Sequence, residues 1–316
     1  MLRFCARRLG GSLVTLLISS FLIFGSLYLV PGDPAVYLAH GRVTAPQLAA
    51  LRREYGLGQP FFERYVHWLF GLVHGNLGES LQYHEPAARL IGSRLAVTGT
   101  LVAYAAVLII LGGLALGLLG ALRRGTLVDR GVLLFSSAAT AAPAFLTVVL
   151  LLAIFSVDLH WFPALGAGQG FGDRLWHLTL PAVGLALSAV GLITRVSRTA
   201  FLDSLRREHV EVARSRGLSE RSVIRRHVVR NSLGPVATMT GLVVATLVVS
   251  TTVVESAFGI NGIGSLLDSS VQTLDYPVIQ AISLLVVVVF LVCNTAVDLL
   301  YPFIDPRVAS WRSRAA

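Results

Sequence analysis

Six long apolar stretches divide this chain, and they restrict its fold more than any other feature. They run over Leu9–Val30, Leu95–Leu122, Val132–Val157, Leu175–Thr194, Leu233–Val254 and Val278–Leu300. Each is about as long as the roughly 20 residues that a helix needs to cross the hydrocarbon core of a bilayer. With 54% hydrophobic and 14% charged residues, the chain also has too little polar surface for a soluble globule of its size. The pattern predicts an all-α integral membrane protein with six transmembrane helices.

One segment of the chain is far more basic than the rest. Ten arginines lie between the fourth and fifth apolar stretches or directly beside them: Arg195, Arg198, Arg206, Arg207, Arg214, Arg216, Arg221, Arg225, Arg226 and Arg230. Cytoplasmic loops of membrane proteins carry an excess of Lys and Arg, so this segment should lie in the cytoplasm. Six spans return the chain to the side on which it started, which places both termini in the cytoplasm as well.

Several classes of function are excluded by what the sequence lacks. All 26 basic residues are arginine, and a nucleotide-binding P-loop needs a lysine on the phosphates, so the chain has no Walker A site of its own. No HExxH, paired-cysteine or Ser/His/Asp pattern occurs, and neither a catalytic site nor a metal site is expected. The net charge of +9 comes from short clusters beside apolar spans without interleaved aromatic residues, which argues against binding to nucleic acid.

The spans divide the sequence into three parts. Residues 1–30 form the N-terminus and first span, residues 31–94 form an extracytoplasmic segment with short helices, and residues 95–316 form a core of five spans with a cytoplasmic loop at 203–232. In the outer segment, Thr44 and Gln47 form a capping-box pattern around Pro46, which predicts a short helix to about Tyr55.

A second helix is predicted in the outer segment by an apolar stripe at helical spacing. Its members are Phe62, Tyr65, Val66, Leu69, Leu72 and Val73. With Tyr65 and Trp68 suited to a membrane–water boundary, we expect this helix to lie on the outer membrane surface. It would serve either as a structural collar or as a gate or docking surface for an external partner.

Proline and glycine residues interrupt several of the apolar stretches. Pro143 lies in the third, Pro181 in the fourth, and Gly112, Gly113, Gly117 and Gly120 lie in the second. Membrane helices tolerate both residue types, and small residues let helices approach closely. The pattern is typical either of kinked helices that rock around a pathway or of ordinary close packing.

The cytoplasmic loop carries the most specific local pattern. A helix is predicted from Asp203 to Arg216, with Gly217 as its left-handed C-terminal cap, and Ser219 then caps a second helix through about Arg230. The candidate contact residues for another protein are Glu208, Glu211, Ala213, Ser215, Gly217 and Leu218, of which Ala213 and Gly217 stand four residues apart on a face that a partner could approach closely. The alternative is an amphipathic helix resting on anionic lipid.

This loop resembles the "EAA" loop of the inner-membrane subunits of ATP-binding-cassette (ABC) importers. Glu211, Ala213 and Gly217 match that motif, and Val212 replaces its first alanine. His227, Val229 and Arg230 stand where the general motif has Ile, Leu and Pro. The stretch from Ala213 through Pro235 is similar to the peptide/nickel permease branch of these importers.

The resemblance extends over nearly the whole chain. The chain resembles in particular the B-type permease subunit of dipeptide, oligopeptide and nickel importers. The other landmarks are Arg7-Arg8-Leu9, Pro31-Gly32-Asp33-Pro34-Ala35, Gly75-Asn76-Leu77-Gly78 with Ser80, Arg94-Leu95 with Thr98, the Glu255–Leu267 region, Asp275-Tyr276-Pro277-Val278-Ile279-Gln280, Val297-Asp298-Leu299-Leu300-Tyr301 and Asp305-Pro306-Arg307. Asn261 stands where the family commonly has proline.

The resemblance implies a type I ABC importer permease fold in the bacterial cytoplasmic membrane. It also implies a heterodimer with a second, homologous permease, two ATP-binding subunits and an extracytoplasmic substrate-binding protein. The cargo would be peptides, with nickel chelates or glutathione as alternatives. Since the chain has no lysine, ATP and Mg²⁺ would bind only in the partner subunits, and closure of those subunits would push the Glu211–Gly217 element as a lever.

Charged residues near the span ends raise a further expectation. Glu255, Phe258 and Asn261 are candidate pathway or outer-gate residues; the alternative for Glu255 is a helix-end hydrogen bond that holds the Gly259–Gly264 turn. Asp298 is expected to be structural, facing Arg307 or an arginine of the first span. A proton-coupled carrier is the rival class, and it predicts more buried ionisable groups and inverted repeats than the sequence offers.

Overall fold

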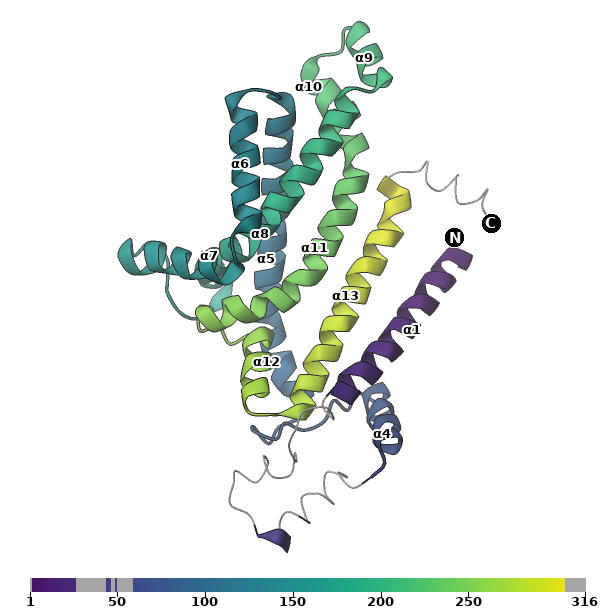
Figure 1. Cartoon of the computed structure of the whole chain (residues 1–316), viewed down its shortest axis with the longest axis vertical. Helices are drawn as coiled ribbons and strands as arrows, with labels where there is room; N and C mark the ends of the chain where they lie inside the picture. Colours follow the sequence, from purple (N-terminus) through teal and green to yellow (C-terminus); the bar gives the residue numbers. More distant parts are fainter. Residues whose placement is uncertain (1, 27–43, 47–48, 50–58, 305–316) are drawn as a thin grey trace. The chain divides into compact units, whose positions relative to one another are not determined.

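The computed structural model describes residues 2–26, 44–46, 49 and 59–304 of the chain. These residues fold almost entirely into helices (Figure 1). Within the described residues, only an isolated bridge between Glu79 and Pro86 pairs two extended segments. The predicted helix ending near Tyr55 falls largely outside the described residues.

Five helices are long and apolar enough to cross a membrane, and a bent pair of helices would make a sixth span. The five are α1 (Leu2–Ser26), α5 (Ala87–Leu122), α8 (Gly170–Leu205), the continuous helix Glu220–Ala257 that ends in α11 (Arg230–Ala257), and α13 (Tyr276–Ile304). The prediction of an all-α membrane fold is therefore confirmed.

The third predicted span is a bent pair of helices and not one continuous helix. α6 (Leu127–Ala141) is followed by α7 (Ala144–Leu151) and the π-helix η1 (Leu152–Asp158), and the two parts are bent by 104°. Pro143 causes the break, because a proline disfavours helical backbone at the residue before it and cannot donate to the preceding turn. Ala142 accordingly has an extended backbone, with φ −69° and ψ 126°.

Two of the spanning helices run well past the apolar stretches that predicted them. α5 and α8 each have 36 residues. A bilayer core accommodates only about 20 residues of helix. The apolar pattern marks the part of a helix that suits lipid, and it says little about where the helix ends. α8 continues past Thr194, where the predicted span ends, to Leu205, and this extension carries Arg195 and Arg198.

The chain divides into two compact units. One comprises residues 1–96 and 261–289, and the other comprises residues 97–260 and 290–316. In the first unit, a small apolar core is built where the beginning of α5 meets α12 (Ile263–Gln272) and the beginning of α13. Its buried members are Ala87, Leu90, Ile91, Ile263, Leu266, Val278, Ala281 and Ile282.

α4 (Phe61–Val73), in the same unit, confirms the helix predicted from the apolar stripe. Its aromatic residues pack on α1, where the ring of Phe24 lies 5.4 Å from Phe61, 5.6 Å from Tyr65 and 5.4 Å from Trp68. The hydroxyls of Ser20 and Tyr65 are hydrogen-bonded at 2.9 Å. Tyr65 and Trp68 therefore hold the helix to a neighbouring span.

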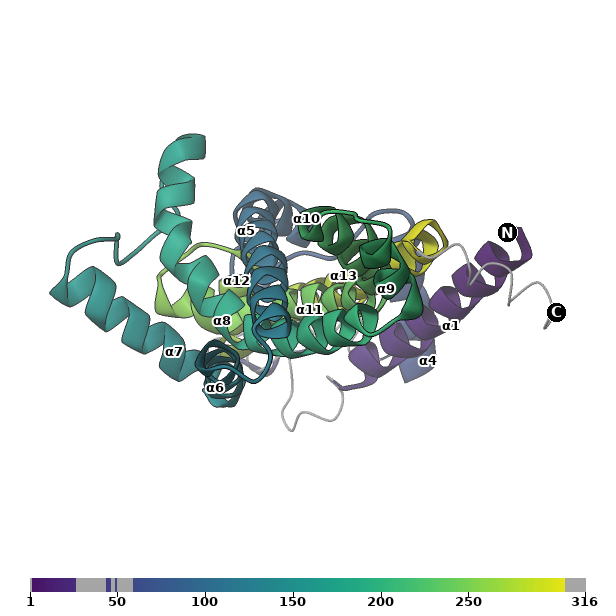
Figure 2. The ribbon, with the colours of Figure 1, turned by 90° about the horizontal axis from the view of Figure 1, so that it is seen from above.

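In the second unit, α8 is the central helix. It contacts α6, α7 and α11, and in the view from above it runs between α5 and α6 (Figure 2). α5 and α8 approach so closely that a Cβ added at Gly113 would lie 2.5 Å from Ile193 Cγ2, and one at Gly117 would lie 2.6 Å from Ser197 Cβ. The glycines of the second apolar stretch thus serve close helix packing.

Candidate functional site

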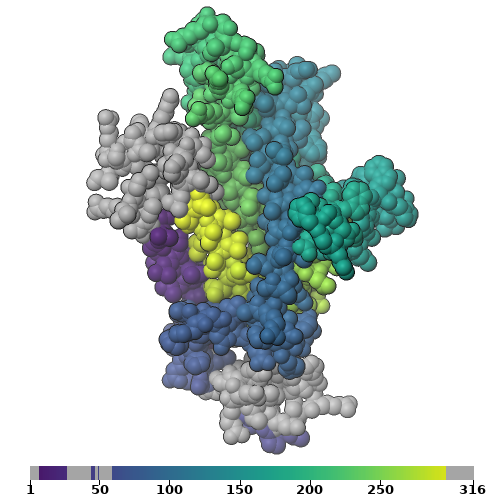
Figure 3. Space-filling model, turned by 180° about the vertical axis from the view of Figure 1, so that it is seen from behind, coloured from purple at the N-terminus to yellow at the C-terminus, as the bar shows by residue number. Residues whose placement is uncertain are grey.

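The predicted cytoplasmic loop folds as a helix, a bend and a second helix. α8 ends at Leu205, and α9 (Glu208–Ser215) follows after a turn; beyond the bend come α10 (Glu220–Val223) and the π-helix η2 (Ile224–Val229), which continues into α11. In the space-filling view this segment, drawn in green, projects beyond the ends of α5 and α6 (Figure 3). We call α9, the bend and α10 the docking segment.

Both boundaries predicted for this loop need correction. The first helix begins at Glu208 and not at Asp203, because Asp203 belongs to the last turn of α8. Arg207 has an extended backbone, with φ −79° and ψ 142°, and it separates α8 from α9. The second helix does not end near Arg230 but runs on into the next span.

The bend has the predicted left-handed glycine. Gly217 has φ +75°, its N–H donates to Arg214 O at 2.9 Å, and the N–H of Leu218 donates to Ala213 O at 3.3 Å. This pair of bonds is the Schellman motif, which suits glycine because a left-handed backbone strains any residue with a Cβ. Ser219 occupies the N-cap position of the second helix, but its side chain makes no capping bond.

An exposed ion pair spans the bend. Arg214 Nη2 lies 2.6 Å from Glu220 Oε1, and Arg214 Nε donates to Glu220 Oε2 at 3.1 Å. Because both side chains face water, the pair contributes little to stability, but it orients the two arms of the bend.

The two sides of α9 differ sharply in burial. Val210 and Ala213 are buried in an apolar cluster whose other buried members are Ala121, Phe201, Val223 and Val228. The spacing predicted that Ala213 lies on a face open to a partner, and this prediction is wrong for Ala213. Its small side chain packs inside the chain's own core. The opposite side is exposed and carries Glu208, Glu211, Val212 and Ser215 at i, i+3, i+4 and i+7, with Leu218 exposed at the bend.

Polar bonds join the helices beneath the docking segment to one another, and one of them reaches α9. Ser232 Oγ donates to Ala200 O of α8 at 3.0 Å, and Ser204 Oγ lies 3.3 Å from His227 O in η2. Asn231 Nδ2 lies 3.2 Å from His209 Nε2 and 2.6 Å from His227 O. His209 is thus hydrogen-bonded to the start of α11. In the part of the chain that the structure describes, no group of three potential metal ligands occurs.

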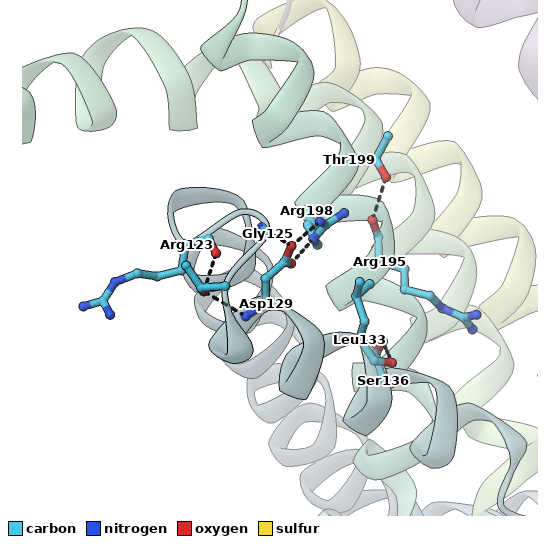
Figure 4. Close-up of polar contacts among 9 residues, drawn as sticks. Arg123, Gly125, Asp129, Leu133, Ser136, Arg195, Arg198 and Thr199 are labelled. Carbon is cyan, nitrogen blue, oxygen red and sulfur yellow. Dashed lines mark hydrogen bonds and ion pairs between the residues drawn. The ribbon is translucent and has the colours of Figure 1, made fainter.

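A buried ion pair between α6 and α8 was not expected from the sequence (Figure 4). Arg198 of α8 donates to Asp129 of α6 through two nitrogens, with Nε 2.6 Å from Oδ1 and Nη2 2.8 Å from Oδ2. The N–H of Gly125 adds a bond of 2.9 Å to Oδ2. One signal in the sequence could have pointed to Asp129. It stands three residues after Thr126, in the position of a helix-capping acid, within a turn that is otherwise rich in arginine. We call the pair Asp129–Arg198 the clasp.

The candidate gate residues belong to two different units of the chain. Glu255 and Phe258 are buried in the second unit, with 0% and 1% of their surface exposed. Glu255 Oε1 accepts a hydrogen bond of 2.7 Å from Thr98 Oγ1, and the Glu255 backbone carbonyl accepts one from Ile260. Asn261 is exposed, and it is the first residue of the 261–289 stretch of the first unit. The side chain of Asp298 and all of Arg307 lie outside what the structure describes.

Comparison with known proteins gives matches along nearly the whole chain. Residues 113–310 match the family described as "Binding-protein-dependent transport system inner membrane component", and residues 1–101 match its N-terminal region. A protein of Brucella suis biovar 1 (strain 1330), which carries the provisional name of a peptide permease, is 37% identical over 316 residues, covering 98% of this chain and 99% of the relative. The glutathione transport system permease protein GsiC of Escherichia coli (strain K12) is 35% identical over 308 residues, covering 98% and 99%.

Solved structures agree in fold. The chain is similar to an inward-facing conformation of the MetNI methionine ABC transporter, with a TM-score of 0.55 and 18% identity over 68% of this chain and 96% of that chain. It is also similar to an amino acid ABC transporter, with a TM-score of 0.50 and 16% identity over 69% and 94% of the two chains. The family match and the 37% identical relative show that this chain belongs to the family of inner membrane components of binding-protein-dependent transport systems.

Proposed function

We propose that this chain is one permease subunit of an ATP-driven importer that passes peptides across the bacterial cytoplasmic membrane. The names of its relatives support this cargo, since one is provisionally a peptide permease and another transports glutathione, itself a small peptide. Glutathione is the alternative cargo on the same evidence. Nickel chelates remain an alternative that only the resemblance of the loop supports.

The observation that carries the energy-coupling part of the proposal is the two-sided character of α9. Its buried residues Val210 and Ala213 share an apolar cluster with Phe201 of α8, and His209 Nε2 lies 3.2 Å from Asn231 Nδ2 of α11. These contacts hold the docking segment rigid with respect to the helices below it. Its exposed side offers two acids, a serine and Val212 to a partner, and Leu218 is exposed at the bend beside it. A rigid exposed helix of this kind transmits a push instead of absorbing it by deforming locally.

The partner on this face would be an ATP-binding subunit. Without lysine the chain holds no P-loop, so ATP and Mg²⁺ would be bound, and ATP hydrolysed, in two such subunits. The complex would be completed by a homologous second permease, which forms a heterodimer with this chain, and by an extracytoplasmic substrate-binding protein. A proton-coupled carrier is the less favoured reading, because the buried acids of the described spans, such as Asp129 and Glu255, already have hydrogen-bond donors within the protein.

The test uses the assembled importer in liposomes, with peptide uptake and ATP hydrolysis measured together. Glu211→Arg reverses a charge on the exposed face of α9, and Gly217→Pro removes the N–H that bonds Arg214 O and forbids φ +75°. Both variants should insert and assemble but lose uptake and substrate-stimulated ATP hydrolysis by at least about tenfold. Asp158→Arg, which changes an exposed acid at the end of η1, is the matched control and should behave as the parent. Normal import by both variants would show that the docking segment is not the coupling element.

A further inference from the structure

The clasp stands about two helical turns before α8 reaches the docking segment. Arg198 belongs to the extension of α8 beyond its apolar stretch, and Asp129 belongs to the first turn of α6, three residues after the N-cap Thr126. The side chain of Asp129 is 6% exposed and that of Arg198 is 17% exposed. The pair thus joins two helices that are 69 residues apart in sequence, at the level of the arginine-rich turn between α5 and α6.

The geometry of the clasp fixes orientation as well as distance. A planar guanidinium that meets both oxygens of a carboxylate resists rotation of one helix against the other, which a lysine's point charge would not do. The bond from Gly125 N–H to Asp129 Oδ2 holds the carboxylate to the turn as well as to α6. A buried pair of this kind adds little net stability, because desolvation offsets much of the attraction. Its distinctive effect is therefore on relative position.

Close packing around the clasp extends this constraint to α5. A Cβ at Gly120 would lie 3.2 Å from Arg198 Cδ and 3.3 Å from Val132 Cγ1, so the stem of Arg198 lies directly against the backbone of α5. The next residue, Ala121, is buried in the same apolar cluster as Val210 and Ala213 of α9. The end of α5, the start of α6, the end of α8 and α9 are thus linked by direct contacts.

We propose that Asp129 is a positioning residue for energy coupling: through Arg198 it makes the α5–α6 turn move together with the docking segment. A displacement imposed on α9 is then delivered to α6 as well as to α8, and along α6 to the break at Pro143. Without the clasp, α8 can turn against α6, and part of the displacement is lost before it reaches the spans. This inference rests on the proposed function, because it presupposes that a partner pushes α9.

The first test measures rigidity directly in the assembled importer. Spin labels are placed at Leu127→Cys, the exposed first residue of α6, and Arg221→Cys, exposed on α10, in a chain whose native cysteines Cys5 and Cys293 are replaced by serine. With Asp129 present, the distance between the labels should be the same without nucleotide and with ATP and vanadate. With Asp129→Asn, the distance should change between the two states and its distribution should broaden.

The second test measures the peptide transported for each ATP hydrolysed. Asp129→Asn and Arg198→Gln should each lower this ratio several-fold while the complex still assembles and hydrolyses ATP. The double variant should be no worse than either single variant, because both remove the same interaction. Arg195→Gln is the matched control, since Arg195 lies on the same helix, is exposed and points away from Asp129 (Figure 4), and it should keep the parental ratio.

Two outcomes separate this inference from the proposed function. A parental transport ratio together with a nucleotide-independent label distance in Asp129→Asn would overturn the role of the clasp, even if Glu211→Arg abolishes coupling. Normal import by both Glu211→Arg and Gly217→Pro would instead remove the coupling role proposed for the docking segment. If Asp129→Asn does not assemble, Arg198→Lys is used in its place, because lysine keeps the positive charge but cannot bond both carboxylate oxygens at once. The label distance and the transport ratio of that variant are then judged by the same criteria.

Discussion

Ser80 donates a hydrogen bond of 2.5 Å to Asp275, although the two residues are 195 positions apart. The other oxygen of the Asp275 carboxylate accepts from the N–H of Leu81 at 3.1 Å, and the carboxylate is fully buried. Nearby, a Cβ at Gly78 would lie 3.1 Å from Pro277 Cβ. Two separate landmarks of the sequence, the segment around Gly75–Ser80 and the segment from Asp275, are therefore two halves of one structural feature.

The first prediction concerns this buried carboxylate. Asp275→Asn should loosen the loop after α4. The carboxylate has two acceptor oxygens for Ser80 and Leu81, whereas the amide has one, and its NH₂ group would face one of these donors. Leaving a buried donor unsatisfied costs about 1–3 kcal/mol. Hydrogen exchange measured by mass spectrometry should show faster exchange at Leu81 and Gln82. Glu79→Gln, an exposed neighbour, is the control, and equal protection in both variants would contradict the assigned role.

The second prediction concerns the contact between α5 and α8. Gly117→Val should destabilise the protein, because even a Cβ would lie 2.6 Å from Ser197 Cβ and 3.0 Å from the backbone of α8. Overpacking of this kind costs about 1–3 kcal/mol or more. Gly99→Ala in the same helix has open space around the new methyl group and should be neutral or slightly stabilising. Thermal unfolding in detergent would distinguish them, and equal melting temperatures would refute the close approach.

The third prediction addresses Glu255, whose role as a gate residue stays a prediction. Because its carboxylate is fully buried and bonded to Thr98, we expect it to act from inside the protein. Glu255→Gln keeps an acceptor for the Thr98 hydroxyl and should retain most peptide uptake, whereas Glu255→Leu removes that acceptor and should lose it. Loss of uptake in Glu255→Gln, with assembly intact, would instead show that the charge itself is needed in the pathway.

The sequence predicted the parts of this fold that depend on local pattern. The spans follow from apolar length, and the bend at Gly217 follows from the left-handed backbone that glycine favours. The break at Pro143 was only half foreseen, since a proline inside an apolar stretch predicts a kink but not a bend of 104°.

The parts that the sequence did not reveal depend on contacts between distant residues. The clasp joins Asp129 to Arg198, and no spacing rule relates two residues so far apart. The burial of Ala213 was missed for a different reason. Spacing shows which residues share a side of a helix, but which side is covered depends on the neighbours, here Phe201 and Val223.

The last prediction concerns the surroundings of α4, which has three distinct sides. Phe61, Tyr65 and Trp68 face α1, whereas Glu63 and His67 lie on an exposed polar side. The third side is apolar and exposed, and its members are Phe62, Val66, Phe70 and Val73. The first side holds α4 to α1. If α4 lies on the membrane surface, the side with Glu63 and His67 faces water and the exposed apolar side faces lipid.

Continuity with α1 supports lipid as the environment of that third side. The rings of Phe21 and Phe62 are stacked with centroids 6.4 Å apart, and both are exposed, so the apolar surface of a span continues onto α4. A spin label at Val66→Cys should therefore be relaxed more by oxygen, which concentrates in lipid, than by a water-soluble nickel chelate. A label at Glu63→Cys should show the reverse. A Val66 label that responds chiefly to the nickel chelate, and is shielded only when a substrate-binding protein is added, would identify this side as a docking surface for that protein instead.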